Sequence, residues 1–246
     1  MGADVRWLLP ALCAITLCHA RDAVAQAPET PAARCSWEGW LPPSAARIRV
    51  RQSATLSAAD LSDLRRRALS SDKNTRMLAA LKLGSANDLA TMQTLMQLTT
   101  DASFQVQDAA ARSLGRGGYF DAVPSLIRMA ASPDSHVRQG AVWALGQIQD
   151  ARALPTLIAA SRDTSKHIRN EATWALGLVG GSSAVDRLIQ LASDTNPHVR
   201  LAAACSLESA HDGRALGALR SLSRDVDPVV RDVGSWALDQ VNARAR

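Results

Sequence analysis

Apolar positions along most of the chain recur with the spacing of a helix. One clear copy places Val137, Ala141, Ala144 and Leu145 three or four residues apart, and the same pattern begins again 31 residues later at Ile168. These offsets put the side chains on one stripe of a helix. Because the stripe returns at a fixed interval, the sequence predicts one small helical unit repeated several times.

An arginine marks the same place in each copy of this pattern. It stands at Arg76, Arg138, Arg169, Arg200 and Arg231, and Gln107 fills the remaining position. Four residues earlier a short polar side chain recurs, at Asp72, Ser103, Asp134, Ser165, Asn196 and Asp227. Such side chains accept hydrogen bonds from the free N–H groups of a first helical turn. We therefore predict helices, here called A-helices, at about 73–84, 104–115, 135–147, 166–178, 197–209 and 228–243.

A second apolar pattern follows each A-helix. Val123, Leu126 and Ile127 show it, and it begins again at Leu154 and Val185. This indicates a B-helix in every unit, with residues 57–69 as an extra B-type helix that caps the N-terminal end. A unit of this size cannot bury a core alone, so each must pack on its neighbours. The predicted fold is an all-α, right-handed α-solenoid of stacked antiparallel helix pairs over residues 57–246.

Small residues form two further columns. The first is Ala79, Ala110, Ala141, Ala172, Ala203 and Gly234, which is typical of a place where another helix backbone approaches closely. The second is Gly84, Gly115, Gly146 and Gly177, interrupted by Glu208 and Asp239. We expect these four glycines to end their A-helices in a left-handed conformation, which glycine adopts most easily.

The motif within one unit resembles that of the HEAT repeats. Pro155, Asp163, Ile168 and Arg169 have its order and spacing, and the phrases VRQGAVWALG and IRNEATWALG resemble the short HEAT-like repeats of phycobilisome lyases. The resemblance covers about residues 57–243. It implies a hydrogen-bonded ladder that joins the Asp and Arg residues of successive repeats, here Asp163, Asp194 and Asp225 with Arg169, Arg200 and Arg231. Ser132 and Gln107 depart from the motif, so we expect the ladder to be incomplete near the second and third A-helices.

The N-terminal region has the features of an export signal. An apolar run from Trp7 to Ala20 is too short to span a bilayer, and Ala23-Val24-Ala25 has the small residues that a signal peptidase reads. We expect residues 1–25 to be a signal peptide and residues 26–56 to be a linker rich in Pro, Ala and Arg. This predicts a periplasmic or secreted protein.

Two cysteines, Cys35 and Cys205, remain in the chain after residue 25. One stands in the linker and the other on the fifth A-helix, so two free thiols are the favoured interpretation, with a disulfide as the alternative. Trp37 and Trp40 are unusual for a linker. We expect them to fold back on the first helices, with a partner-binding anchor as the alternative.

The sequence offers little catalytic chemistry. His136, His167 and His198 share a column, but stacked helices lie ~8–10 Å apart, whereas zinc ligands lie ~2 Å from their ion. Deoxyhypusine hydroxylase resembles this chain in its repeats and binds di-iron through His–Glu pairs. The corresponding pairs here are Gln139-Gly140, Asn170-Glu171 and Leu201-Ala202, which keep a single glutamate and no histidine. We predict no metal, no cofactor and no catalytic residue; a HEAT-like lyase or hydroxylase is the alternative.

Charge is unevenly distributed over the predicted helices. The B-helices and their ends carry Arg128, Arg152, Arg162, Arg187, Arg214 and Arg224, beside Thr156 and Gln190. The outward side of the A-helices instead carries Asp108, Glu171 and Asp232, and a column of Trp143, Trp174 and Trp236 that we expect to pack against neighbouring A-helices.

Because B-helices line the concave side of such solenoids, these arginines predict a basic groove. We expect it to bind a protein partner with an acidic or extended segment. One alternative is a solvated face whose arginines pair with Asp163 and Asp225. Another is a nucleic-acid or other polyanion site, although the net charge of +5 is modest and export disfavours nucleic acid. A third is a purely structural accessory domain.

Overall fold

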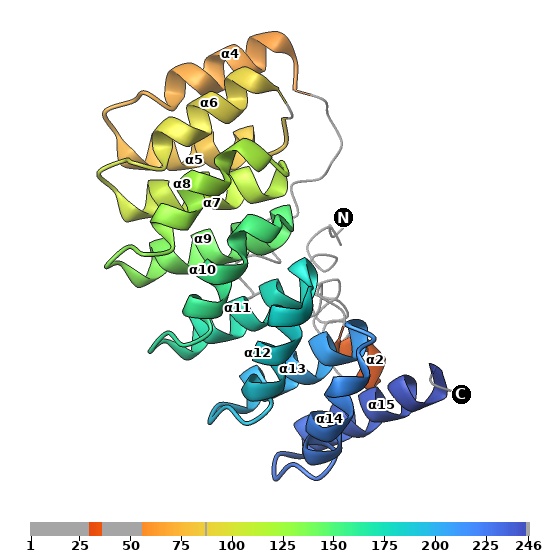
Figure 1. The fold of residues 1–246 in the computed structure, drawn as a ribbon. Helices are drawn as coiled ribbons and strands as arrows, with labels where there is room; N and C mark the ends of the chain where they lie inside the picture. Colours follow the sequence, from red (N-terminus) through yellow and green to blue (C-terminus); the bar gives the residue numbers. More distant parts are fainter. Residues whose placement is uncertain (1–29, 36–55, 87, 245–246) are drawn as a thin grey trace, which may run out of the picture.

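The computed structural model describes residues 30–35, 56–86 and 88–244 (Figure 1). The predicted signal peptide and the two tryptophans Trp37 and Trp40 lie outside the described residues. Within the described ranges every regular element is helical, and helix pairs stack one after another from α4 at one end to α15 at the other. The predicted α-solenoid is confirmed.

The helices alternate between two layers. The A-helices are α5 (Lys73–Leu83), α7 (Phe104–Arg116), α9 (Ser135–Ile148), α11 (Lys166–Val179), α13 (Pro197–Ser209) and α15 (Pro228–Arg244). The B-helices are α4 (Ala58–Arg67), α6 (Leu89–Leu98), α8 (Val123–Met129), α10 (Leu154–Ala160), α12 (Ser182–Leu191) and α14 (Leu216–Leu222). Short 3-10 turns, η2 (Phe120–Ala122), η3 (Ala151–Ala153) and η4 (Gly213–Ala215), lead into α8, α10 and α14.

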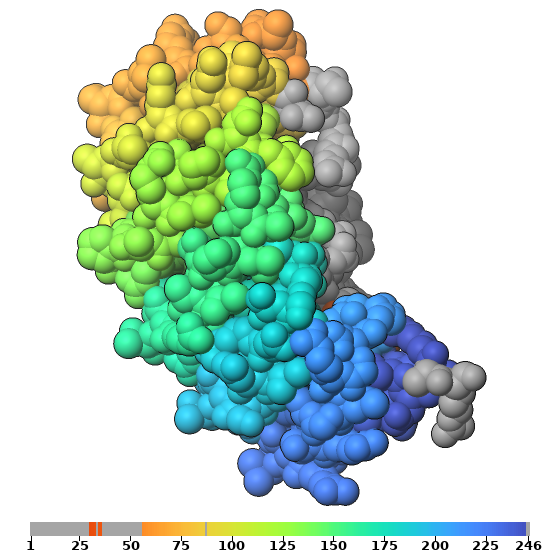
Figure 2. Space-filling model, viewed as in Figure 1, coloured from red at the N-terminus to blue at the C-terminus, as the bar shows by residue number. Residues whose placement is uncertain are grey.

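Two leucine columns fill the space between the layers. Both keep the 31-residue period, with Leu83, Leu114, Leu145, Leu176 and Leu207 on the A-helices and Leu95, Leu126, Leu157, Leu188 and Leu219 on the B-helices. All ten side chains are fully buried. Neighbouring A-helices pack on one another, and each B-helix packs on the A-helix that follows it. The core therefore runs without a break along the stack, and Figure 2 shows the corresponding continuous body.

Most of the predicted N-caps are present. Asp72 accepts a hydrogen bond from the Thr75 N–H, Asp134 from those of His136 and Val137, Asn196 from that of His198, and Asp227 from those of Val229 and Val230. Ser103 and Ser165 make no side-chain cap bond. In this column the cap bond is thus present where the side chain is Asp or Asn and absent at the two serines.

The prediction for the glycine column is wrong. Gly84 has a right-handed φ of −63°, and Gly115, Gly146 and Gly177 lie inside their helices. A Cβ on Gly146 would lie 2.7 Å from the Cβ of Ala175 on the next A-helix, and the other three glycines face Ser113, Ala144 and Ser206 as closely. These positions favour glycine because adjacent A-helices approach closely. Over the described ranges, the non-glycine residues with a left-handed backbone are Gln149 and His211.

The implied Asp–Arg ladder is present. In each rung, the Nε and Nη2 atoms of an arginine donate to the two carboxylate oxygens of the aspartate 25 residues later. The pairs are Arg76–Asp101, Arg138–Asp163, Arg169–Asp194 and Arg200–Asp225. Each of these four arginines also donates from Nη1 to backbone carbonyls of the loop before its helix, for example Arg200 to the Asp194 carbonyl at 2.9 Å. The ladder thus ties every linked A-helix both to its own loop and to the next loop.

The ladder is interrupted once, as expected. Gln107 and Ser132 are also 25 residues apart, so the two departures from the motif are the two halves of one missing rung. Gln107 instead donates from Nε2 to the carbonyl of Asp101 at 2.5 Å. The expectation for Arg231 is only partly met: among the described residues it forms no ion pair with an aspartate, and it keeps the loop contact by donating to the Asp225 carbonyl at 2.9 Å.

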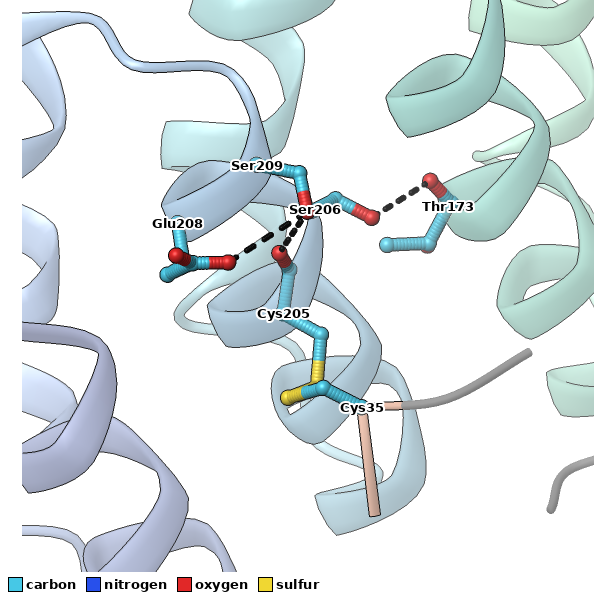
Figure 3. Close-up of a disulfide and its surroundings, with 6 residues drawn as sticks. All are labelled: Cys35, Thr173, Cys205, Ser206, Glu208 and Ser209. Atoms are coloured by element: carbon cyan, nitrogen blue, oxygen red, sulfur yellow. Dashed lines mark hydrogen bonds between the residues drawn. A yellow bond between two sulfur atoms is a disulfide. The ribbon is translucent and has the colours of Figure 1, made fainter. Parts of the chain in front are cut away.

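A disulfide joins Cys35 to Cys205, so the prediction of two free thiols is wrong (Figure 3). The Cα atoms lie 5.2 Å apart although 170 residues separate them in sequence. Residues 31–34 of the expected linker form helix α2 (Pro31–Arg34), which packs against α15 beside α13 (Figure 1). Sequence spacing could not show this pairing, because Cys35 lies outside the repeats and its partner Cys205 lies on the fifth A-helix.

Candidate partner-binding surface

The predicted site residues all lie in the B-helix layer or at its ends. Arg128 is on α8, Arg152 on η3, Thr156 on α10, Arg187 and Gln190 on α12, and Arg214 on η4, while Arg162 and Arg224 follow α10 and α14. Thr156 and Arg187 are half-buried and the other six are exposed. We call these eight residues the B-helix face. They come from four successive repeats, so no single helix makes the surface.

Two arginines of the B-helix face are neutralised by aspartates in the turns before them. Arg152 donates to Asp150 from Nε and Nη2, at 2.9 and 2.6 Å, and also to the carbonyl of Phe120. Arg214 contacts Asp212 and Asp186, each at 2.6 Å. Hydrogen bonds from these arginines hold the pKa of Asp150 and Asp212 below the usual value. Little net charge is therefore left at either arginine.

The remaining four arginines have no carboxylate partner within the described residues. Arg128 donates to the Ser125 hydroxyl at 2.8 Å, and Arg187 donates to Ser161 and Gln190. Arg162 and Arg224 are exposed and form no ion pair in the same part of the chain. Asp163 and Asp225 are engaged by Arg138 and Arg200 of the ladder, so the alternative that pairs the B-helix arginines with these two aspartates is wrong.

Sequence reasoning missed the division between neutralised and unpaired arginines. Each neutralised arginine has an aspartate two residues before it, Asp150 before Arg152 and Asp212 before Arg214, and this aspartate also caps the 3-10 turn. That Asp-x-Arg spacing is the signal that could have found them. It also missed Arg220, an exposed arginine on α14.

Two of the acidic residues expected on the outer side of the A-helices, Asp108 and Glu171, are partly buried. Arg112 of α7 donates to Asp108 at 2.9 Å, and its guanidinium lies 5.6 Å from the ring centroid of Trp143. Burial raises the pKa of Asp108. Gly140 provides the space for that carboxylate, because a Cβ there would collide with it. Burial likewise raises the pKa of Glu171, whose carboxylate accepts a hydrogen bond from Gln139.

In the tryptophan column, Trp143 shows the expected packing, and Trp236 is partly buried against the core. Trp143 and Trp174 are 9% exposed, and a ring carbon of Trp143 lies 3.1 Å from the place where a Cβ on Gly115 would stand. Trp143 therefore packs on the preceding A-helix. At the next position of the column, after Trp174, stands Cys205, whose side chain is bonded to Cys35.

The histidine column shows no shared ligand geometry. The ring of His136 stacks on Phe104, with ring centroids 5.6 Å apart. Over the described ranges, no three His, Cys, Asp or Glu side chains are grouped so that they could hold a metal ion. In the same ranges, no helix is both long and apolar enough to cross a membrane.

Comparison with known families agrees with this geometry. The family model described as HEAT repeats matches residues 61–132, 92–177 and 156–239, which together run without a break over more than half of the chain. The chain belongs to the HEAT-repeat family. No curated protein matches it.

Several solved structures share the fold of this HEAT-repeat protein. An engineered protein is 22% identical, covering 75% of this chain and 97% of its own, with a TM-score of 0.59. The complex of CpcE and CpcF of phycocyanin lyase from Nostoc sp. PCC7120 is 24% identical, covering 75% and 77%, with a TM-score of 0.58. A designed armadillo repeat protein in complex with the peptide (KR)4 is 20% identical, covering 74% and 100%, with a TM-score of 0.58. At these identities the likeness concerns the fold.

Proposed function

We propose that this HEAT-repeat protein is an exported, non-enzymatic scaffold that binds a partner protein on its B-helix face. The observation that carries the proposal is the set of B-helix arginines without carboxylate partners in the described residues, namely Arg128, Arg162, Arg187 and Arg224. The stack would supply a rigid surface, and these side chains would supply charge for an acidic or extended segment.

The two faces of the stack differ in availability. On the A-helix side, α2 packs against α15 and the disulfide fixes the tail to α13. The B-helix face carries no such covering among the described residues. Solenoids present extended concave surfaces that they use for binding, and the designed armadillo neighbour is in complex with the peptide (KR)4. An arginine-bearing face would favour a peptide of the opposite charge.

The location is proposed on two grounds. Residues 1–25 have the composition of a signal peptide. The Cys35–Cys205 disulfide supports the same placement, since disulfides persist in oxidising compartments such as the periplasm and the extracellular space.

The test is partner capture with two matched tryptophan variants. Ala159 is exposed on α10 within the B-helix layer, and Leu78 is 54% exposed on α5 in the A-helix layer. Ala159→Trp should abolish capture of the native partner from an envelope extract, while Leu78→Trp should retain it. Both variants should keep the helical circular dichroism of the wild type.

Equal capture by the two variants would refute binding on the B-helix face. Stoichiometric iron in the purified protein would instead favour a hydroxylase, and attachment of a bilin to a captured partner would favour a lyase. Loss of binding with a steep dependence on salt would favour a polyanion ligand.

A further inference from the structure

Arg187 is held in place at the junction of α10 and α12. Its Nε donates to the Ser161 hydroxyl at 2.7 Å and its Nη2 to the Ser161 carbonyl at 3.0 Å. Nη1 donates to the side-chain oxygen of Gln190 at 2.7 Å. A guanidinium has five N–H donors, so two remain for another acceptor. The group is therefore fixed, charged and incompletely satisfied.

A second cation stands beside it. Arg162 follows Ser161 directly in the chain and is exposed. Burial lowers the pKa of Arg187, and the positive charge of Arg162 lowers it further. Among the described residues, the carboxylate whose charge raises the pKa of Arg187 is that of Asp194, which already accepts hydrogen bonds from Arg169 and from the Asn196 N–H. The two arginines therefore repel one another without a free carboxylate between them in the described part of the chain.

The repeat does not require these side chains. At the position of Arg187 the other units carry Thr94, Ser125, Thr156 and Ala218. At the position of Arg162 they carry Thr100, Ala131, Ser193 and Arg224. At the position of Ser161 they carry Thr99, Ala130, Ala192 and Ser223. Small neutral residues satisfy the fold at all three places, so stacking does not account for this cluster.

We propose that Arg162 and Arg187 form the point on the B-helix face that binds a carboxylate side chain from an acidic segment of the partner. The inference rests on the proposed function and names the chemistry of the partner at one place. A carboxylate there would relieve the repulsion between the two cations and accept the N–H groups that Arg187 leaves free. Guanidinium groups bind carboxylates in a two-pronged geometry, which favours this ligand.

Ser161 is the positioning residue for the cluster. It is fully buried, so it holds Arg187 without being exposed to a ligand. A hydroxyl is needed for that contact, whereas the fold accepts alanine at the equivalent positions.

The experiment titrates the full-length chain with a fluorescently labelled hexaglutamate peptide at low ionic strength. Arg162→Gln and Arg187→Gln should each weaken binding about tenfold, as the loss of one charged hydrogen bond implies. Lys73→Gln is the control, because it removes one positive charge from an exposed side chain at the start of α5, outside the B-helix face. It should change the affinity about twofold or less.

Two Ser161 variants separate positioning from general destabilisation. Ser161→Ala should weaken peptide binding without changing the thermal stability. Ser161→Thr should bind the peptide like the wild type, because it keeps the hydroxyl and Thr99 shows that the fold accepts threonine at this position. No binding of hexaglutamate by the wild type would overturn the inference. Equal losses in the Lys73, Arg162 and Arg187 variants would do so too, as would complete competition by equimolar inorganic phosphate.

A failure of this contact point can be distinguished from a failure of the proposed function. The native partner could still be captured in an Ala159-sensitive manner while hexaglutamate fails to bind, which would retain the B-helix face and remove this contact point. If hexaglutamate binds but Ala159→Trp still captures the native partner, the contact point would be retained and the proposed function refuted.

Discussion

Removing the disulfide should destabilise the whole solenoid, because the bond closes a loop of 170 residues between Cys35 and Cys205. Cys35→Ser is the cleanest change, since it leaves the buried Cys205 in its helix. In the chain-entropy description, a closed loop of this length restricts the unfolded chain by about 5 kcal/mol at 25 °C. For a domain of this size, that corresponds to a fall in melting temperature of roughly 10–20 °C.

The structure gives a second reason to expect this loss. Helix α2 has four residues, which is too short to persist alone, so its packing on α15 depends on the bond. The terminal helix of a solenoid has a neighbour on one side only. Detachment of α2 would leave α15 with α13 and α14 as its support, and unfolding should begin there.

Thermal unfolding followed by circular dichroism checks this prediction with the wild type, Cys35→Ser and wild type in reductant. Reductant should lower the melting temperature of the wild type and leave that of Cys35→Ser unchanged. A difference of less than 2 °C between oxidised and reduced wild type would refute the reasoning. Thiol titration provides an independent check, because the chain without residues 1–25 should contain no reactive thiol before reduction.

Three further predictions concern the stack itself. Restoring the missing rung with Gln107→Arg and Ser132→Asp together should raise the free energy of unfolding by about 1 kcal/mol. A double-mutant cycle should assign this gain to the interaction of the two new side chains, and additive effects of the single variants would contradict it. Gly146→Ala should destabilise the fold by about 1–3 kcal/mol in chemical denaturation, because the new Cβ would lie 2.7 Å from the Cβ of Ala175. Gly217→Ala on α14 is the control, because its Cβ would meet nothing within 4 Å, and it should be neutral or slightly stabilising. Hydrogen bonds from Arg76 and Arg200 lower the pKa of Asp101 and Asp225 in the folded state. The stability that these ion pairs contribute should therefore be complete above about pH 4 and be lost as the pH falls through the lowered pKa values of the folded state. In acid titration, Arg200→Gln should lose less stability than the wild type between about pH 4 and pH 2.

The period in the sequence was sufficient to predict the fold. Each unit repeats the same stripe, cap and arginine, so an error at one position, such as the missing cap bond at Ser165, leaves the unit identifiable. The ladder could also be expected, including its gap at Gln107 and Ser132, because the arginine and the aspartate of each rung stand 25 residues apart in the sequence.

Other features depend on distances that a repeat pattern does not contain. The glycine column has the same sequence signature whether it ends a helix or admits a neighbouring one, and only the approach of Ala175 to Gly146 distinguishes the two. The disulfide joins a residue outside the repeats to one inside, so no period relates Cys35 to Cys205. On the B-helix face, local hydrogen bonds decide which arginines keep an unbalanced charge.

The places where this chain departs from its own period are the places where specific properties are to be sought. Residues that keep the period, such as Leu145 and Arg169, have a structural reason that applies to every unit and therefore identify no partner. Cys205 replaces a tryptophan of its column and receives the tail. Arg187 stands where the other units carry small neutral side chains, and it is held by a hydroxyl that they do not need. Because stacking explains neither departure, an account of function has to explain both, and the second is the one that a soluble acidic peptide can test directly.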